Sequence, residues 1–382
     1  RVCCETNSFF IYKSLMILTW ISIALISIYL IVLLIFTFAF IKRKTFAEKC
    51  NDFSKKLSVI IAFRNEKANL KQLIDSLLNQ NNAPNFEIIL VNDHSEDNFL
   101  EVLNSFSDER IKLYNITEEF TGKKAALRFG ISKSQGEILF FTDADCVLPK
   151  NWISTMLAYQ QKNNVQMLCG PVKFKDSNKF LEKIFALEFM SMTGSGAAGF
   201  FIDKAFMCNG ANYCICKSIL NEVGADFNNE FSSGDDVFLL HYVSSKYKVD
   251  FLKSYDACVE TSAPSSLQEF FNQRIRWASK ISGYRNAFSI FVALATYFSA
   301  FSLLFLVILT LFFTKFYALL IAVLVAKFVV EILFLIPISK FYKQSNCLIY
   351  LPLVQLFHPL YVVFIPLIPF FYKPKWKNRK II

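Results

Sequence analysis

Long apolar runs occupy both ends of the chain, and a segment of alternating apolar and polar stretches lies between them. Residues 14–41 carry no charge, and a helix of that length reaches roughly 40 Å, enough to cross a bilayer with some tilt. The run is too long for a signal peptide and has no small-residue cleavage site. We therefore predict a membrane helix over residues 9–41. Residues 1–8 stay unassigned, since a first residue other than Met is consistent with a processed or truncated start.

Between residues 57 and 285, short β-branched runs alternate with polar, helix-like stretches. This alternation is typical of an α/β fold with a mainly parallel sheet. In such sheets ligands bind outside the carboxyl ends of the strands, and Asp93, Asp143 and Asp145 all fall at those ends. We predict one domain over residues 45–285. Strands are expected at 57–63, 86–93, 111–116 and 137–145, and helices at 65–80 and 122–134.

After residue 285 the chain becomes apolar again. Residues 288–313 and 316–338 are each long enough to span a membrane. A third apolar run, 347–371, contains four prolines and His358, which make a straight helix unfavourable. We expect this run to enter the membrane and turn back, or to lie along its interface, packed on its neighbours. The predicted segments are therefore a membrane region at 286–371 and a basic tail at 372–382.

Two charged residues, Lys327 and Glu331, interrupt the second of these spans one helical turn apart. Opposite charges at this spacing can pair on one helix face, and in lipid such a pair should face protein or a cavity. We expect them to neutralise each other and interpret the pair as structural.

The distribution of charge bears on location and partners. The chain has 41 basic and 31 acidic residues, a formal charge of +10, and many basic residues flank the apolar runs. This pattern favours a membrane protein over a nucleic-acid partner. The sequence "KRK" at 42–44 follows the first span directly, so the positive-inside rule predicts a multi-pass protein of the cell membrane with its central domain in the cytoplasm. The ten cysteines show no paired framework or zinc spacing, as expected for free thiols.

Four polar clusters in the central segment each have an ordinary structural explanation. Asp143 and Asp145 in "FFTDAD" could form an Asx turn, and Asp93 could cap the next helix. The sequence "GDD" at 234–236 could be a loop before a helix. The sequence "QRIRW" at 273–277 could be an interfacial helix anchored by Trp and Arg.

The sequence "GSGAAG" at 194–199 satisfies the glycine spacing of a dinucleotide-binding loop. Such a loop should follow a strand and open a helix, but this one follows a helix-like run. We therefore expect a flexible turn at the membrane interface rather than a dinucleotide site.

In this order within one α/β segment, the polar clusters resemble the family 2 glycosyltransferases. These are membrane-embedded GT-A enzymes and include synthases of poly-N-acetylglucosamine, cellulose, hyaluronan and ceramide sugars. The resemblance covers residues 57–285 and is most specific in the Asp-x-Asp at 143–145 followed by the Gln-x-x-Arg-Trp at 273–277. It implies a Rossmann-like GT-A domain and a nucleotide-sugar donor, usually a UDP-sugar. It also implies Mg²⁺ or Mn²⁺, because a cation that bridges the donor phosphates stabilises the leaving group and prefers oxygen ligands.

The resemblance also assigns residues to the donor site. Asp145 would bind the metal, Asp143 would contact the ribose or support the metal, and Asp93 would read the base. The further donor contacts would be Glu66, Lys123 and Arg276.

On the acceptor side, the resemblance implies an inverting reaction in which a carboxylate takes the proton of the acceptor hydroxyl. Asp236 is the expected base and Asp235 its neighbour, since adjacent carboxylates can raise one pKa. The acceptor would be a lipid or a lipid-linked glycan. Processive polysaccharide synthesis and an inactive membrane scaffold remain alternatives, and the sugar and the oligomeric state stay open. The acceptor-side residues would be Gly210, Asn212, Gln273, Arg274 and Trp277.

Overall fold

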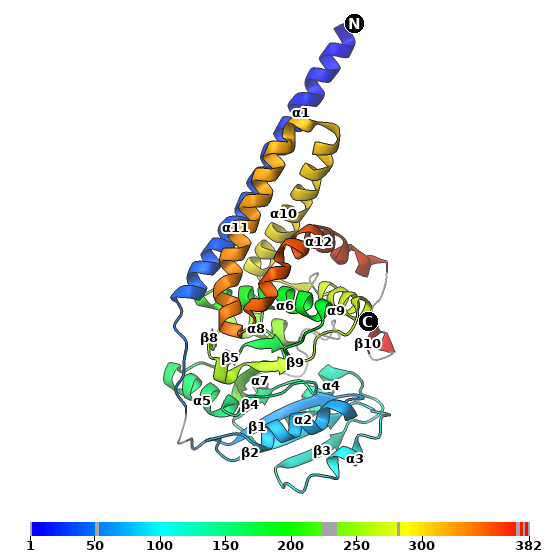
Figure 1. The fold of residues 1–382 in the computed structure, drawn as a ribbon. Helices are drawn as coiled ribbons and strands as arrows, with labels where there is room; N and C mark the ends of the chain where they lie inside the picture. The colour runs from blue at the N-terminus through cyan, green and yellow to red at the C-terminus, as the bar shows by residue number, and fades with distance from the viewer. Residues whose placement is uncertain are drawn as a thin grey trace.

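The computed structural model describes residues 2–49, 53–223, 235–280, 283–371, 375–376 and 379–380. Figure 1 shows an α/β domain with a bundle of long helices standing on one side of it. Within the bundle, α1 (Val2–Lys42) contacts both α10 (Ala287–Phe312) and α11 (Tyr317–Tyr342). The first apolar helix thus includes residues that the sequence analysis left unassigned at 2–8.

The domain is built on a seven-stranded sheet of order β3-β2-β1-β4-β7-β5-β8. Strands β1 to β4 pair in parallel, as do β5 and β8, whereas β7 is antiparallel to both of its neighbours. The predicted mainly parallel α/β fold is therefore confirmed. A second, two-stranded parallel sheet pairs β6 with β9. The strands are β1 (Leu57–Phe63), β2 (Phe86–Asn92), β3 (Ile111–Asn115), β4 (Ile138–Phe141), β5 (Met167–Cys169), β6 (Val172–Phe174), β7 (Tyr213–Cys216), β8 (Val249–Phe251) and β9 (Val259–Thr261).

Apolar residues on both faces of the central strands explain why helices cover the sheet on both sides. Every residue of β1 is buried, which is typical of a parallel strand between helical layers. Gly130 in α4 lets that helix approach closely, since a Cβ there would stand 2.7 Å from Cγ2 of Ile60. The helices of the domain are α2 (Lys67–Leu78), α3 (Leu100–Leu103), α4 (Lys123–Lys133), α5 (Trp152–Asn163), α6 (Phe180–Phe201), α7 (Lys217–Val223), α8 (Asp235–Ser244), η1 (Tyr255–Ala257) and α9 (Leu267–Ala278).

The glycine-rich sequence at 194–199 is helical, so the predicted flexible turn is wrong. It forms the last part of α6, which is continuous from Phe180 to Phe201. Close packing explains the small residues, because a Cβ on Gly194 would stand 2.4 Å from Cδ1 of Ile338 in α11, and a Cβ on Gly199 would stand 2.5 Å from the ring of Phe206. The glycines therefore allow α6 to pack tightly against its neighbours. Strand β4 also ends earlier than predicted, at Phe141, and the Asp-x-Asp lies in the loop after it.

Among the described residues, five helices are long and apolar enough to cross a membrane. One of them is α6, which the sequence analysis did not predict as a span. Figure 1 shows α6 lying across the base of the long helices, between them and the domain, and most of its apolar window is buried. The other four are α1, α10, α11 with η3 (Thr314–Phe316), and a segment made of η4 (Ser345–Tyr350), α12 (Leu351–Phe364) and η5 (Ile365–Phe370).

The proline-rich segment rises beside α10 and bends at its end (Figure 1). Its first part, η4, contacts α6, and its last part, η5, contacts α9. Both ends of the segment therefore touch helices of the domain. In the tail, β10 (Lys375–Trp376) pairs with β11 (Arg379–Lys380), and the other residues of 372–382 lie outside the described part of the chain.

Candidate active site

The site begins where β1 and β2 end. The backbone N–H of Asp93 donates to the carbonyl of Phe63 at 2.8 Å, which continues the pairing of the two strands. The Asp93 side chain is 1% exposed and accepts a hydrogen bond from the backbone N–H of Gly122 at 3.1 Å. Gly122 precedes α4 and has φ of +97°, a conformation that favours glycine. This contact ties the end of β2 to the start of α4.

The first residue of α4 brings a positive charge to the Asp-x-Asp. The Lys123 ammonium forms an ion pair with Asp143. Burial alone would lower the pKa of Lys123, but the carboxylate of Asp143 holds that pKa above its ordinary value. Lys123 is therefore cationic near neutral pH and is available to neutralise negative charge at this edge of the sheet.

The second carboxylate of the motif, Asp145, lies deeper. Its Oδ2 accepts a hydrogen bond from the hydroxyl of Thr261 at 3.0 Å. Burial, followed by the charges of Asp143 and Glu66, raises the pKa of Asp145. A divalent cation would relieve this repulsion, because it offers positive charge to carboxylate oxygens. The oxygen chemistry of Asp143 and Asp145 thus fits a divalent cation. No group of three or more His, Cys, Asp or Glu side chains suited to a metal occurs among the residues described.

Arg276 in α9 interacts electrostatically with the same cluster. Burial lowers the pKa of its guanidinium, and the carboxylates of Asp143, Asp145 and Asp236 oppose that effect. Since a guanidinium stays charged at any ordinary pH, Arg276 adds a second fixed cation to the one supplied by Lys123.

The expected base, Asp236, is held at the start of α8. Its Oδ2 accepts from the backbone N–H of Gly210 at 2.7 Å, and its Oδ1 accepts from the backbone N–H of Val237 at 2.9 Å. Burial and the charge of Asp236 raise the pKa of Tyr284, so this tyrosine keeps its proton. Gly234 and the side chain of Asp235 lie outside the described residues.

Two of the predicted acceptor residues are enclosed by protein. Asn212 is 0% exposed; its amide donates to the carbonyls of Pro171 and Ala257 at 2.8 Å, and its oxygen accepts from the Trp152 indole at 2.8 Å. The geometry favours a structural role for this side chain. Arg274 is also buried. It binds Glu188 of α6 with a distance of 3.0 Å between Nε and Oε1, and hydrogen-bonds Gln273.

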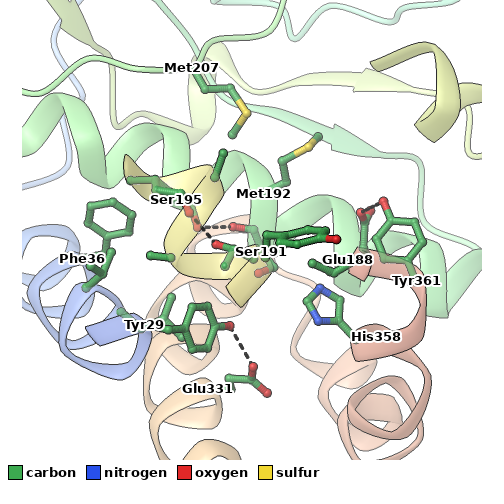
Figure 2. Close-up of a pocket in the computed structure, with 18 of the residues that line it drawn as sticks. Tyr29, Phe36, Glu188, Ser191, Met192, Ser195, Met207, Glu331, His358 and Tyr361 are labelled. Carbon is green, nitrogen blue, oxygen red and sulfur yellow. Dashed lines mark hydrogen bonds between the residues drawn. The ribbon is translucent and has the colours of Figure 1, made fainter. Parts of the chain in front are cut away.

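A cavity of about 600 Å³ lies where helices of the domain meet the long helices (Figure 2). Its lining is mostly apolar and comes from α1, α6, α9, α10, α11 and α12. Trp277 and Tyr284 form part of the wall. Met207 also lines it, and the next residue, Cys208, donates through its thiol to the carbonyl of Asp236 at 3.3 Å. The cavity therefore adjoins the segment that holds the expected base.

Several cavity residues did not stand out in the sequence. Glu188 and Tyr284 lie in segments without a motif, and His358 and Tyr361 lie in an apolar run that is interrupted by prolines. Their helices become neighbours only in the folded chain. The sequence does contain one indication of Glu188: it is a charged residue within the apolar part of α6. Like Glu331, a charge in such a helix requires a partner.

Comparison with known proteins identifies the domain. Residues 58–220 match the family described as glycosyl transferase family 2. Over 122 residues the chain is 33% identical to an uncharacterised glycosyltransferase of Haemophilus influenzae, an alignment that covers 31% of this chain and 48% of that protein. Over 265 residues it is 27% identical to a poly-β-1,6-N-acetyl-D-glucosamine synthase of Staphylococcus epidermidis, covering 66% of this chain and 62% of the relative. The chain thus spans about half to two thirds of the length of these relatives.

The fold has a counterpart among solved structures. The mannosyltransferase PcManGT from Pyrobaculum calidifontis, in complex with GDP-Man and Mn²⁺, superposes with a TM-score of 0.59 at 17% identity, covering 89% of this chain and 99% of that one. At this identity the likeness shows the fold: a GT-A domain combined with long apolar helices. Taken with the sequence match, it shows that the chain carries a domain of glycosyltransferase family 2, flanked by several long apolar helices.

Proposed function

We propose that the protein transfers a sugar, with inversion at the anomeric carbon, from a nucleotide-sugar to a lipid or lipid-linked glycan at the cytoplasmic face of the membrane. The observation that carries this proposal is the convergence of three carboxylates and two cations at the edge of the sheet, next to an apolar cavity. The residues concerned are Asp143, Asp145, Asp236, Lys123 and Arg276.

On the donor side, Asp93 follows the end of β2 and contacts the base of the nucleotide. The first donor to test is a UDP-sugar. Lys123 and Arg276 face the diphosphate and stabilise the charge that develops on it. Asp143 and Asp145 would hold Mg²⁺ or Mn²⁺, which when bound would add Lewis-acid stabilisation of the departing nucleoside diphosphate. Glu66, whose charge already acts on Asp145, completes the acidic side of the site.

On the acceptor side, Asp236 takes the proton of the attacking hydroxyl. The bond between the anomeric carbon and the diphosphate oxygen breaks as the new glycosidic bond forms on the opposite face of the sugar. The nucleoside diphosphate leaves with the bonding electron pair, and the proton stays on the carboxylate. Gly210 and Val237 orient that carboxylate through their backbone N–H groups, which keeps it within reach of the acceptor.

The apolar cavity supports a lipid as the carrier of the acceptor hydroxyl. Its volume, about 600 Å³, lies within the range of pockets that enclose small ligands. Trp277 lines it, and an aromatic side chain suits lipid and sugar alike. The relative from Staphylococcus epidermidis makes a polymer, so processive synthesis is the second candidate function.

A screen of donors tests the proposal. Purified protein in lipid nanodiscs would be supplied with UDP-sugars or GDP-mannose, a membrane lipid extract, and Mg²⁺ or Mn²⁺. We expect metal-dependent release of one nucleoside diphosphate and a new glycolipid of one added sugar by mass spectrometry. A ladder of products would establish processive synthesis instead. Absence of release with every donor would refute the proposal and leave an inactive scaffold.

A further inference from the structure

A row of polar side chains runs along the cavity on one face of α12. Gln355, His358 and Tyr361 follow one another at intervals of three residues and all line the cavity; His358 and Tyr361 are labelled in Figure 2. At this spacing the side chains share a helix face, and the row extends over about 9 Å. Its occurrence in an otherwise apolar segment calls for polar partners.

Each end of the row meets a carboxylate. The hydroxyl of Tyr361 donates to Oε1 of Glu188 at 3.2 Å. At the other end, the amide of Gln355 lies 3.4 Å from Oε2 of Glu331, whose Oε1 accepts from the hydroxyl of Tyr29 at 2.9 Å. The row therefore joins a carboxylate of α6 to one of α11 along the cavity wall.

Both carboxylates already have cationic partners. Arg274 pairs with Glu188, and Lys327 pairs with Glu331. These two ion pairs leave the wall with no net charge. A phosphate entering here would have to compete with a buried carboxylate for each cation, which is unfavourable. The wall is thus suited to an uncharged ligand.

The polar groups of His358 and Gln355 can nevertheless form further hydrogen bonds. Within the described part of the chain, no side chain or backbone group hydrogen-bonds the ring of His358. The contact of Gln355 with Glu331, at 3.4 Å, is long for a hydrogen bond. Polar groups at membrane depth are costly when they lack partners, so a ligand that supplies donors and acceptors would be bound selectively.

We propose that this row binds an uncharged group of the acceptor that carries hydroxyls or an amide, and so selects neutral acceptors over polyprenyl phosphates. The inference rests on the proposed function of the cavity as the acceptor site. Two sources share this chemistry: the sugar of a glycolipid, and the hydroxyl or amide region of a lipid such as a ceramide or a diacylglycerol.

The test is a binding measurement without donor, on the full chain in nanodiscs, by thermal-shift titration. The probes are octyl β-glucoside, C8-ceramide, dioctanoylglycerol and octyl phosphate. We expect at least one neutral probe to bind about tenfold more tightly than octyl phosphate. A preference for the glucoside identifies a sugar as the source, and a preference for the ceramide or glycerolipid identifies the lipid region.

Variants connect the binding to the row. Gln355→Leu and His358→Leu should each weaken the best neutral probe about fivefold, as expected for the loss of one hydrogen bond. If a leucine variant fails to fold, Gln355→Met or His358→Phe is used in its place. The matched control is Thr310→Val in α10, a partly exposed position outside the cavity whose hydroxyl donates to the carbonyl of Val307 in its own helix. This variant should bind the probes like the unmodified protein.

The inference would be overturned if octyl phosphate bound as tightly as the best neutral probe, or if binding were unchanged in the Gln355 and His358 variants. Absence of binding by every neutral probe would overturn it as well. Metal-dependent hydrolysis of the donor by water, measured on the same samples, reports the donor site separately. A loss of that activity would count against the proposed function, whereas the binding data alone decide the role of the row.

Discussion

The backbone N–H of Gly210 points at Oδ2 of Asp236 across 2.7 Å, so the loop before β7 fixes the carboxylate at the start of α8. A Cβ on Gly210 would stand 3.2 Å from that oxygen, which is tight. The contact joins two segments that lie 26 residues apart in the sequence.

Asp236→Asn should stop sugar transfer while donor binding persists, because a general base contacts only the acceptor proton. We expect turnover to fall by about 10²–10⁴-fold and the dissociation constant of the nucleotide to change by less than threefold, both measured on purified protein. Asp235→Asn is the matched comparison. A nucleotide affinity that falls together with turnover in Asp236→Asn would show that Asp236 is not primarily the base.

Asp145→Asn should abolish transfer in protein that remains folded and inserted in the membrane. The reason is that the charges of Asp143 and Glu66 act on the carboxylate of Asp145, and a bound divalent cation would offset the repulsion among these carboxylates. Removal of metal with EDTA should have the same effect on the unmodified protein, and Mn²⁺ or Mg²⁺ should restore activity. Full activity in the variant, or in EDTA, is the result that would exclude a metal role.

Asn212→Ala should destabilise the domain rather than weaken acceptor binding specifically. The substitution leaves the Trp152 indole and the carbonyl of Ala257 without this partner, whereas the carbonyl of Pro171 keeps the backbone N–H of Val259 at 3.0 Å. Unsatisfied buried polar groups cost about 1–3 kcal/mol each, so we expect a lower unfolding temperature and poor yield. Asn81→Ala, at an exposed position, is the control. Unchanged stability with a raised KM for the acceptor would instead support the role implied by the family resemblance.

Gly194→Ala should weaken the packing of α6 on α11. The added Cβ would lie 2.4 Å from Cδ1 of Ile338, and overpacking of this kind costs about 1–3 kcal/mol. Ile338→Val removes that methyl group, so the double variant should be more stable than Gly194→Ala alone in thermal unfolding. Equal stability of the two would show that the side chain of Ile338 moves aside without cost.

The local pattern of the sequence was sufficient to predict the sheet edge of the site. Strands such as β1 are buried on both faces and therefore have nearly continuous apolar sequences, interrupted in β1 only by Ser58. Because parallel strands end at a common edge, carboxylates that follow them, such as Asp93 and Asp143, come together there. In the structure Asp143 pairs with Lys123, and Asp93 accepts a hydrogen bond from the adjacent Gly122.

The cavity was beyond prediction because its walls come from helices far apart in the chain. Glu188 and Arg274 are neighbours only after α6 packs against α9, and nothing near either residue in the sequence indicates the other. The same cause explains the error at 194–199. Local propensity favours a turn for three glycines, but close contacts with Ile338 and Phe206 stabilise a helix.

The orientation of the chain can be tested at the two ends of α11, which runs from Tyr317 to Tyr342 and is about 39 Å long. At one end, the ammonium of Lys315 lies 3.6 Å from the ring centroid of Tyr12, away from the domain. At the other, the ammonium of Lys343 lies 3.9 Å from the ring centroid of Tyr255, which belongs to the domain.

With the domain in the cytoplasm, a membrane-impermeant thiol reagent applied to intact cells should modify Lys315→Cys and spare Lys343→Cys, each made in a variant without the native cysteines. Permeabilised cells provide the control, since the second cysteine should then react as well. A cysteine at Lys380 should behave like the one at Lys343 if the proline-rich segment turns back, because both ends of that segment contact the domain. If Lys380→Cys is modified in intact cells, the proline-rich segment must cross the membrane completely. If Lys343→Cys is modified in intact cells, the domain lies outside the cell and the predicted orientation is wrong.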